Sequence, residues 1–470
     1  MNLFIFLSLL VNPFLIKEFT PVKYEIRKNI EYDLPKEEQN VINNINGFYG
    51  QVGPNPKYYN EKDDYHMFDG DGMIHGVFFD NGNITYTNHW IKTDKFNYQN
   101  IFHSNLVLNI GSLYKLDKIF LLLLYSFFYK LKLVPNMMGN ANTALWYNNN
   151  KLYALNERDY PYELELNFDK KNIYTKKKIN IKNTEYFTAH PKTSIKNDIF
   201  VQSYSNFFPE LTLLNLDSNL KLKKYIKINT NYSGIVHDIA MTDNNIIFCD
   251  TPYQFNMTAI VNKKIPFFFD KTKNNKFCVV SKDLINIDWY DCNESFFIFH
   301  YGECREDNNN IYFNAVVHNE FNMESFSQLK NNDLRNYSKY RRFILDKKTK
   351  KVKIEKKREF ENINVEFPIK HGKFTLLSIF GDNIDIIGFI IVNDFNILNK
   401  VYFKDRKMYG EPSFFENNNK LYIISYTYDD LLNNYIYFYC INTKKSFEIN
   451  LNVPINKGFH SIFINTHLDN

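Results

Sequence analysis

The chain has 470 residues, of which 44% are hydrophobic and 17% aromatic, and its formal net charge is +5. That length allows a single large all-β domain, and many Phe and Tyr side chains suit the half-buried faces of pleated sheets. The five cysteines include no CxxC spacing, which argues against a disulfide framework or a zinc cluster and fits a reducing cytosolic setting. The Lys and Arg residues are dispersed and form no nucleic-acid-binding module.

The N-terminal stretch MNLFIFLSLLVNPFLIK is apolar, but it lacks a basic leader and a small-residue cleavage site. We therefore expect an ordered segment of the mature protein, with a secretory signal peptide as the alternative. The expected location is the cytoplasm, with peripheral association with a membrane.

Residues 66–76, HMFDGDGMIHG, place two aspartates and three glycines between two histidines. No Lys-Ser/Thr pair follows the glycines, so the stretch is not a phosphate-binding loop. We expect a tight buried turn, in which glycine permits positive φ and the aspartates accept backbone N–H groups. His66 and His75 are then structural residues and not ligands.

Five stretches share one pattern, a β-rich run followed by an Asn-rich turn and a second β-rich run. They are residues 76–90, 144–157, 239–250, 304–318 and 412–428. Because Asn tolerates the left-handed backbone conformation, each stretch predicts an antiparallel hairpin, and the basic run at 347–359 predicts a solvated one. No helical periodicity alternates with these hairpins. The pattern favours an all-β chain, with residues 1–470 forming a single propeller of six to eight blades.

Residues 113–134 contain the apolar run IFLLLLYSFF among lysines. Ten residues are too few for a helix to span a bilayer. A buried helix is one interpretation. The other, which we prefer, is an interfacial helix whose apolar side chains enter lipid while lysines stay at the head groups. We expect an apolar cap or membrane-contact segment at about 101–138.

Four of the eleven histidines lie beside strand-like runs, at intervals of about one, one and three blades. They are His190 (AHPK), His237 (VHDIAMTD), His300 (FIFH) and His460 (GFH). Because the inner strands of a propeller line its axis, these imidazoles can converge into a nitrogen site suited to Fe, Zn, Cu or Ni. A structural role for each histidine alone is the alternative.

Longer motifs resemble one known family. Residues 46–93, with GPNP followed by YHMFDGDGMIHG, look like the signature of the carotenoid cleavage oxygenases. Residues 12–25 and 139–164 resemble further blocks of that family, and the four histidine segments match its metal-binding segments in order.

The resemblance implies a seven-bladed β-propeller with a helical cap over an active-site tunnel. It implies Fe(II) held by His190, His237, His300 and His460. It also implies three glutamates, Glu157, Glu366 and Glu411, that hold the outer N–H groups of the ligands.

The implied activity is oxidative cleavage of a C=C bond of a carotenoid or apocarotenoid, in which both atoms of O₂ enter two carbonyl products. The implied partners are an apolar polyene, O₂ and a membrane surface. Stilbene-type alkene cleavage, retinoid isomerohydrolysis and a non-catalytic binding propeller stay open as alternatives. A zinc hydrolase is disfavoured, since no water-activating carboxylate accompanies a three-ligand set.

The sequence departs from the family pattern at three places. Gln51 and Val52 stand where the family has Arg-Asn, Gly302 lies in an altered run after His300, and Ile369 replaces an Arg. These departures bear on substrate choice and on packing near His300 more than on metal binding.

Overall fold

The computed structural model describes residues 21–59, 65–105, 115–134, 139–184, 186–205, 208–255, 267–319, 338–381 and 385–466. The apolar N-terminal stretch and parts of the predicted cap at 101–138 lie outside the described residues. The predictions for those parts stay predictions.

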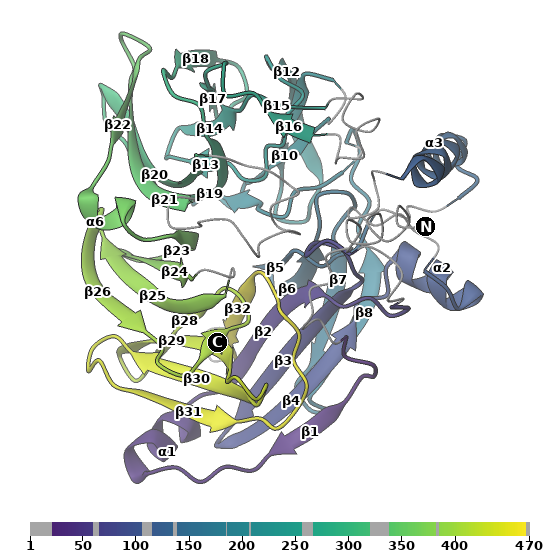
Figure 1. Cartoon of the computed structure of the whole chain (residues 1–470), viewed down its shortest axis with the longest axis vertical. Coiled ribbons are helices and arrows are strands. Elements are labelled where there is room, and N and C mark those ends of the chain that lie inside the picture. The colour runs from purple at the N-terminus through teal and green to yellow at the C-terminus, as the bar shows by residue number, and fades with distance from the viewer. Residues whose placement is uncertain are drawn as a thin grey trace, which may run out of the picture.

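Strands dominate the described chain, and their antiparallel sheets stand side by side around a common centre (Figure 1). The first sheet has the order β1-β4-β3-β2-β32, so it joins an early and a late part of the chain. Its strands are β1 (Arg27–Ile30), β2 (Gly47–Pro54), β3 (Gly72–Asp80), β4 (Asn83–Trp90) and β32 (Ser461–Asn465).

Two four-stranded sheets follow, each with its strands in sequence order. The strands of the first are β5 (Ala144–Asn148), β6 (Lys151–Leu155), β7 (Tyr162–Asn167) and β8 (Asn172–Lys178). Those of the second are β9 (Lys192–Thr193), β10 (Ile199–Tyr204), β11 (Glu210–Leu216) and β12 (Leu222–Asn229).

Two more four-stranded sheets come next, and a two-stranded ribbon interrupts the first of them. The first contains β13 (Ala240–Met241), β14 (Asn245–Asp250), β17 (Lys276–Ser281) and β18 (Ile287–Asp291), with the ribbon β15 (Tyr253–Phe255) and β16 (Phe267–Phe269). The second contains β19 (Phe297–Glu306), β20 (Asn310–His318), β21 (Ser338–Asp346) and β22 (Val352–Glu355).

The remaining strands form one nine-stranded sheet, in which the short strand β27 pairs with both β25 and β29. Its strands are β23 (Val365–His371), β24 (Phe374–Phe380), β25 (Ile386–Asn393), β26 (Asn396–Tyr402), β27 (Lys407–Met408), β28 (Ser413–Asn417), β29 (Lys420–Tyr428), β30 (Asn434–Cys440) and β31 (Ser446–Asn450). Strand β27 therefore bridges two groups, β23–β26 and β28–β31.

All five predicted hairpins are present, as β3–β4, β5–β6, β13–β14, β19–β20 and β28–β29. The conformation of the turn residues explains why the hairpins were predicted correctly. Asn149 and Asn150 between β5 and β6, and Asn418 and Asn419 between β28 and β29, all have φ between 49° and 58°, the left-handed conformation that Asn tolerates. The predicted β21–β22 hairpin is also present. The expectation of a mostly β chain is confirmed.

The hydrophobic core consists of separate clusters that lie between neighbouring sheets. Five clusters join successive sheets from β1–β4 through to β23–β26. A sixth packs β24 and β25 against β29 and β30. A seventh packs β28–β31 against β1–β4, with Tyr49, Tyr86 and Tyr426 at its centre. Each sheet is thus covered on both faces, which accounts for the many fully buried aromatic rings.

The predicted turn at 66–76 is present. Asp69 accepts the backbone N–H of His66 at 2.8 Å, and Asp71 accepts that of Lys57 at 2.9 Å. Gly70 has φ 131°, and a Cβ at Gly72 would collide with the carbonyl oxygen of Ala141.

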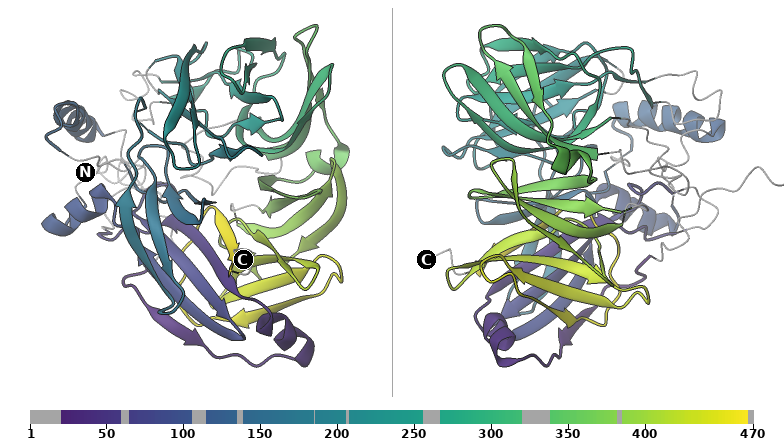
Figure 2. Two further views of the ribbon diagram at one scale, coloured as in Figure 1. Left: turned by 180° about the vertical axis from the view of Figure 1, so that it is seen from behind. Right: turned by 60° about the vertical axis from the view of Figure 1, so that its left-hand side comes forward.

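Four helices are described: α1 (Lys36–Asn43), α2 (Asp94–Phe102), α3 (Leu116–Lys130) and α6 (Arg358–Glu361). Helices α2 and α3 stand to one side of the sheets (Figure 2). The buried-helix interpretation of 113–134 is wrong, because Phe120, Leu123 and Phe127 of α3 are 66%, 64% and 58% exposed. Among the described helices, none has both the length and the apolar composition needed to cross a bilayer.

Candidate metal centre

The four predicted histidines meet at the common centre of the sheets. His190 and His237 lie just before β9 and β13, and His460 directly precedes β32. His300 lies inside β19, where the pairing with β20 shifts register between Ile298 and Tyr301. Each of these strands is the edge strand of its sheet. The same edge thus presents one imidazole from each of four sheets.

The geometry of the four imidazoles fits one metal ion. Their coordinating nitrogens all lie within 4.8 Å of one another, the one such cluster among the described residues. Nε2 of His237 lies 2.9 Å from Nε2 of His190 and 3.2 Å from Nε2 of His300. Two ligands at right angles and about 2.1 Å from a metal would be about 3.0 Å apart, and opposite ligands about 4.2 Å apart. Four neutral imidazoles are a donor set for Fe, Zn, Cu or Ni.

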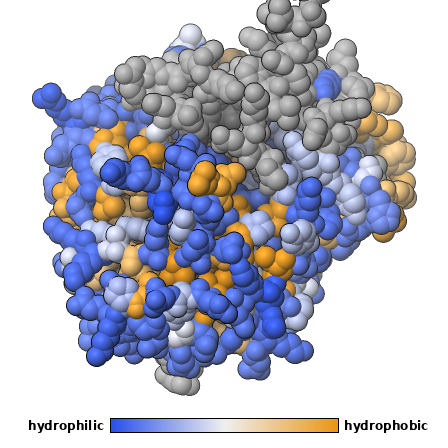
Figure 3. All heavy atoms as spheres, turned by 60° about the horizontal axis from the view of Figure 1, so that its bottom comes forward, coloured by the Kyte–Doolittle hydropathy of each residue, from blue (hydrophilic) through white to orange (hydrophobic). Residues whose placement is uncertain are grey.

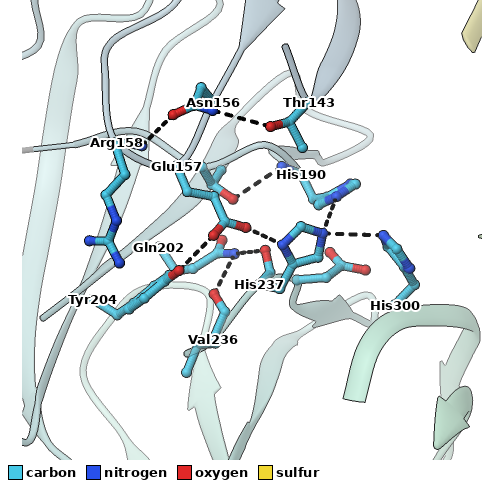
Figure 4. Close-up of polar contacts among 12 residues, drawn as sticks. Thr143, Asn156, Glu157, Arg158, His190, Gln202, Tyr204, Val236, His237 and His300 are labelled. Carbon is cyan, nitrogen blue, oxygen red and sulfur yellow. Dashed lines mark hydrogen bonds and ion pairs between the residues drawn. The ribbon is translucent and has the colours of Figure 1, made fainter. Parts of the chain in front are cut away.

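Glu157 holds the outer nitrogen of His237 (Figure 4). One carboxylate oxygen accepts from Nδ1 of His237, and the other accepts the hydroxyl of Tyr204 at 2.6 Å. Burial disfavours the charge on each partner, but their mutual attraction outweighs it, so the pKa of Glu157 is lowered and the pKa of His237 is raised. Glu157 follows β6 by two residues and Tyr204 ends β10, so the contact links two sheets.

Glu366 of β23 serves two imidazoles at once. Its Oε2 lies 2.6 Å from Nδ1 of His300, and its Oε1 lies 2.7 Å from Nε2 of His318. Although burial alone would raise the pKa of Glu366, these two partners bring it well below its usual range. For His300, burial prevails over the carboxylate, so its pKa is lowered. The pair therefore consists of a charged carboxylate and a neutral imidazole, the state that a metal ligand requires.

Glu411, two residues before β28, holds the fourth histidine. Its Oε2 lies 3.0 Å from Nδ1 of His460 and accepts the backbone N–H of Ser461 at 3.2 Å. Three ligands therefore have their Nδ1 fixed by a carboxylate, which leaves each Nε2 lone pair aimed at the centre. The structure brings all seven predicted site residues together, with each glutamate beside one of the histidines.

His190 differs from the other three because no described carboxylate bonds to its ring. Its backbone N–H donates to the Thr188 hydroxyl at 3.1 Å. Burial and the three neighbouring imidazoles lower the pKa of His190 well below the usual value, so its ring is neutral.

Sequence reasoning missed Tyr204 and His318. Both act through a glutamate and lie at the end of a strand, β10 or β20. Nothing in their local sequence distinguishes them, because the strand pairing alone brings them to the centre. His66 and His75 do not join the cluster, as predicted. His75 is buried, its Nδ1 lies 2.7 Å from the Tyr86 hydroxyl, and burial lowers its pKa to about 3.

The departures from the family pattern lie close to the site. Gln51 is fully buried and its Nε2 donates to the carbonyl oxygen of Glu411 at 3.4 Å. At Gly302 an added Cβ would lie 2.5 Å from the Tyr340 hydroxyl, so this packing favours glycine. Ile369 follows a bulge in β23, where Phe367 has φ 56° and donates its N–H to Glu366 at 2.7 Å.

Comparisons with known proteins agree with this architecture. The carotenoid 9,10(9′,10′)-cleavage dioxygenase 1 of Arabidopsis thaliana is 33% identical over 276 residues, which cover 57% of this chain and 51% of that protein. The protein of the same name from Pisum sativum is also 33% identical, over 57% of this chain and 50% of its own. The match thus spans about half the length of these curated relatives.

Two solved structures share the fold. The lignostilbene dioxygenase of Pseudomonas brassicacearum superposes with a TM-score of 0.76 at 18% identity, covering 95% of this chain and 97% of that one. Cobalt-substituted Synechocystis apocarotenoid oxygenase gives 0.75 at 17% identity, covering 95% and 98%. The family described as retinal pigment epithelial membrane protein matches residues 28–465. The chain therefore belongs to the retinal pigment epithelial membrane protein family, that of the carotenoid cleavage oxygenases.

Proposed function

We propose that this protein is a non-haem Fe(II) dioxygenase that cleaves a C=C bond of a carotenoid or apocarotenoid with O₂ and releases two carbonyl products. The observation that carries the proposal is the convergence of His190, His237, His300 and His460, three of them backed by carboxylates. Bound Fe(II), which the four imidazoles would hold, would supply the activation of O₂.

The residues of the chain have three tasks in this proposal. The glutamates fix the tautomer and orientation of three ligands, so each presents a lone pair to the iron. Their charges offset that of the metal in a buried site. The half-buried ring of Phe299 lies 5.3 Å from the ring of His237, and that of Phe367 lies 5.2 Å from the ring of His460. These apolar rings suit contact with a polyene and exclude water. The cleavage needs no general base.

The choice of substrate rests on the relatives. The two curated relatives described above are named for cleavage of carotenoids at the 9,10(9′,10′) position, and an apocarotenoid oxygenase shares the fold. Since the match covers about half the length of those relatives, the proposal extends to the substrate class and leaves the position of the cleaved bond to the experiment below.

We infer a seven-bladed propeller from the sheets and their cores. If β23–β26 and β28–β31 count as two blades, the seven clusters lie one between each pair of neighbouring blades. Packing of β28–β31 on β1–β4 then closes the ring. Helices α2 and α3 belong to the helical cap.

Contact with a membrane is a further part of the proposal. Apolar side chains gather at the right-hand edge in Figure 3, on the side where α3 lies in Figure 1. Phe120, Leu123 and Phe127 share one face of α3 at helical spacing, and Ile101 and Phe102 at the end of α2 are also exposed. Such a surface suits uptake of a substrate that dissolves in lipid.

Purification with Fe(II) under anaerobic conditions, followed by isotopically labelled O₂ and a panel of carotenoids, apocarotenoids and stilbenes, tests the function. We expect aldehydes with label in both products, and their loss in His300→Ala. Products from stilbenes alone would correct the substrate class. Stoichiometric iron with no product from any alkene would overturn the oxygenase proposal.

A further inference from the structure

We infer that Asp238 and Lys192 form a clamp that positions His190, the ligand whose ring bonds to no carboxylate among the described residues, relative to His237 and His300. The inference rests on the proposed metal centre. It concerns how the chain places four ligand atoms when the described residues hold three of them by glutamates.

Asp238 touches the segments of three ligands. It directly follows His237 and is 3% exposed. Its Oδ1 lies 2.7 Å from Nζ of Lys192, which is two residues beyond His190. Its Oδ2 accepts the backbone N–H of Tyr301, the residue after His300, at 3.0 Å. One carboxylate therefore ties together chain segments that belong to three different sheets.

The need for the clamp follows from the local structure around His190. The strand after this histidine, β9, has two residues and pairs only with β10. Since no carboxylate of the described part of the chain bonds to the ring, the direction of its Nε2 depends on where the backbone lies. Lys192 pairs with Phe200 through its backbone and with Asp238 through its side chain, so it is fixed on both sides. On the same strand as Phe200, Gln202 donates to the carbonyl oxygen of His237 at 2.8 Å.

The alternative is an ion pair that stabilises the fold and has no particular role at the metal. The structure contains such a pair at one end of the β19–β22 sheet. Glu306, at the far end of β19, lies 2.8 Å from Nζ of Lys347 and accepts the Thr242 hydroxyl at 2.6 Å. Its carboxylate side chain is 6% exposed. Lys347→Met therefore removes a comparable lysine from a buried carboxylate that lies six residues from His300 and bonds to Thr242, five residues from His237.

The experiment measures Co(II) binding to the metal-free full chain by competition with a chelator. It also records the visible absorption of bound Co(II) and the melting temperature with and without metal. We expect Lys192→Met to bind Co(II) about tenfold more weakly, with an altered absorption spectrum and a smaller metal-induced rise in melting temperature. Lys192→Arg should restore both the affinity and the spectrum. Lys347→Met should lower the melting temperature of the metal-free protein and leave affinity and spectrum unchanged.

If Lys192→Met fails to fold, the double variant Lys192→Met/Asp238→Asn replaces it. This variant leaves no unpaired buried charge, and the amide oxygen introduced at position 238 can still accept the Tyr301 N–H. Co(II) affinity and absorption equal to wild type in the folded variant, with only the metal-free melting temperature lowered, would overturn the inference. A wild-type protein that binds no Co(II) would overturn the proposed metal centre and the inference together, so the two failures are distinguishable.

Discussion

At the scale of single residues, each of the three carboxylates beside the ligands is itself held by a second donor. The donors differ in kind: the Tyr204 hydroxyl for Glu157, the His318 imidazole for Glu366 and the Ser461 backbone N–H for Glu411. A carboxylate that cannot rotate fixes the imidazole it accepts from. The second donor therefore helps to set the direction of Nε2 through the glutamate, without contacting the metal site itself.

Removal of one such donor should weaken metal binding. Tyr204→Phe keeps the ring and takes away the hydroxyl that Glu157 accepts at 2.6 Å. Because Glu157 can then rotate away from His237, we expect a Kd for Fe(II) about tenfold higher. Equilibrium dialysis of the metal-free protein measures it.

Tyr312→Phe is the matched control, since that hydroxyl donates to Asp307 at 3.0 Å at an exposed turn. It should leave the affinity unchanged. Equal affinities in Tyr204→Phe and wild type would show that Glu157 is held without the hydroxyl.

The Glu157–His237 pair also predicts how metal binding depends on pH. Glu157 raises the pKa of His237 in the metal-free protein, and a protonated imidazole cannot bind a metal. As the pH falls through this raised pKa, a proton must leave before metal binds, so affinity should decrease about tenfold per pH unit.

In Glu157→Gln the strongest influence that raises the pKa of His237 is lost, while burial and the weaker attraction of Asp238 and Glu366 remain. The decline in Co(II) affinity should then begin at a lower pH than in wild type, even though the affinity at high pH is weaker. The measurement is a Co(II) titration of both proteins at a series of pH values across the neutral range. If the affinity begins to decline at the same pH in both, the Glu157 carboxylate is not the cause of the decline.

At the scale of elements, α3 provides a test of the proposed membrane surface. Replacing Phe120, Leu123 and Phe127 by Ser removes three apolar side chains of α3 that are each more than half exposed. We expect wild type to float with vesicles of phosphatidylcholine containing a minor fraction of phosphatidylserine, and the triple variant to stay in the soluble fraction.

The control is a triple variant at exposed apolar residues far from α3 in the sequence, namely Ile195, Ile285 and Leu431, each changed to Ser. It should float like wild type. Flotation of both triple variants would show that α3 is not the membrane-contact element.

The hairpins were the part of the fold that the sequence predicted best, because their cause is local. Asn pairs at turns such as 149–150 and 418–419 adopt the conformation that the residue type favours. The pairing of β27 with both β25 and β29, and the long insertion that separates β14 from β17, depend on contacts between distant segments. No local sequence pattern predicts these two features.

The site was predictable to a different degree for different residues. The four histidines and three glutamates lie in motifs long enough to compare with a family. Tyr204, His318 and Asp238 act through side chains that meet only after the sheets have packed. Their roles follow from tertiary structure, so neither the strand positions of Tyr204 and His318 nor the place of Asp238 in the VHDIAMTD motif indicates them.

At the scale of the whole molecule, the first sheet depends on strand β32. Gly47 pairs with Asn465, and a Cβ at Gly47 would collide with the carbonyl oxygen of Ile464. Gly47→Ala should therefore push β32 from β2 and reduce stability by about 1–3 kcal/mol. Because His460 directly precedes β32, the variant should also bind Fe(II) more weakly.

Gly388→Ala gives the contrast, since its Cβ would collide with the carbonyl oxygen of Val401 between β25 and β26. We expect a lower melting temperature in both variants and weaker metal binding in Gly47→Ala alone. If both variants lose affinity for Fe(II) to the same extent, the docking of β32 has no special effect on the metal centre.

The pairing of β32 with β2 also fixes an order of events during synthesis. His190, His237 and His300 leave the ribosome before His460, and the last nitrogen reaches the centre only when β32 docks beside β2. A nascent or C-terminally shortened chain can offer three imidazoles at most. In the proposed metal centre, coordination by all four nitrogens would therefore be a late step in biogenesis, because it requires that β32 has docked.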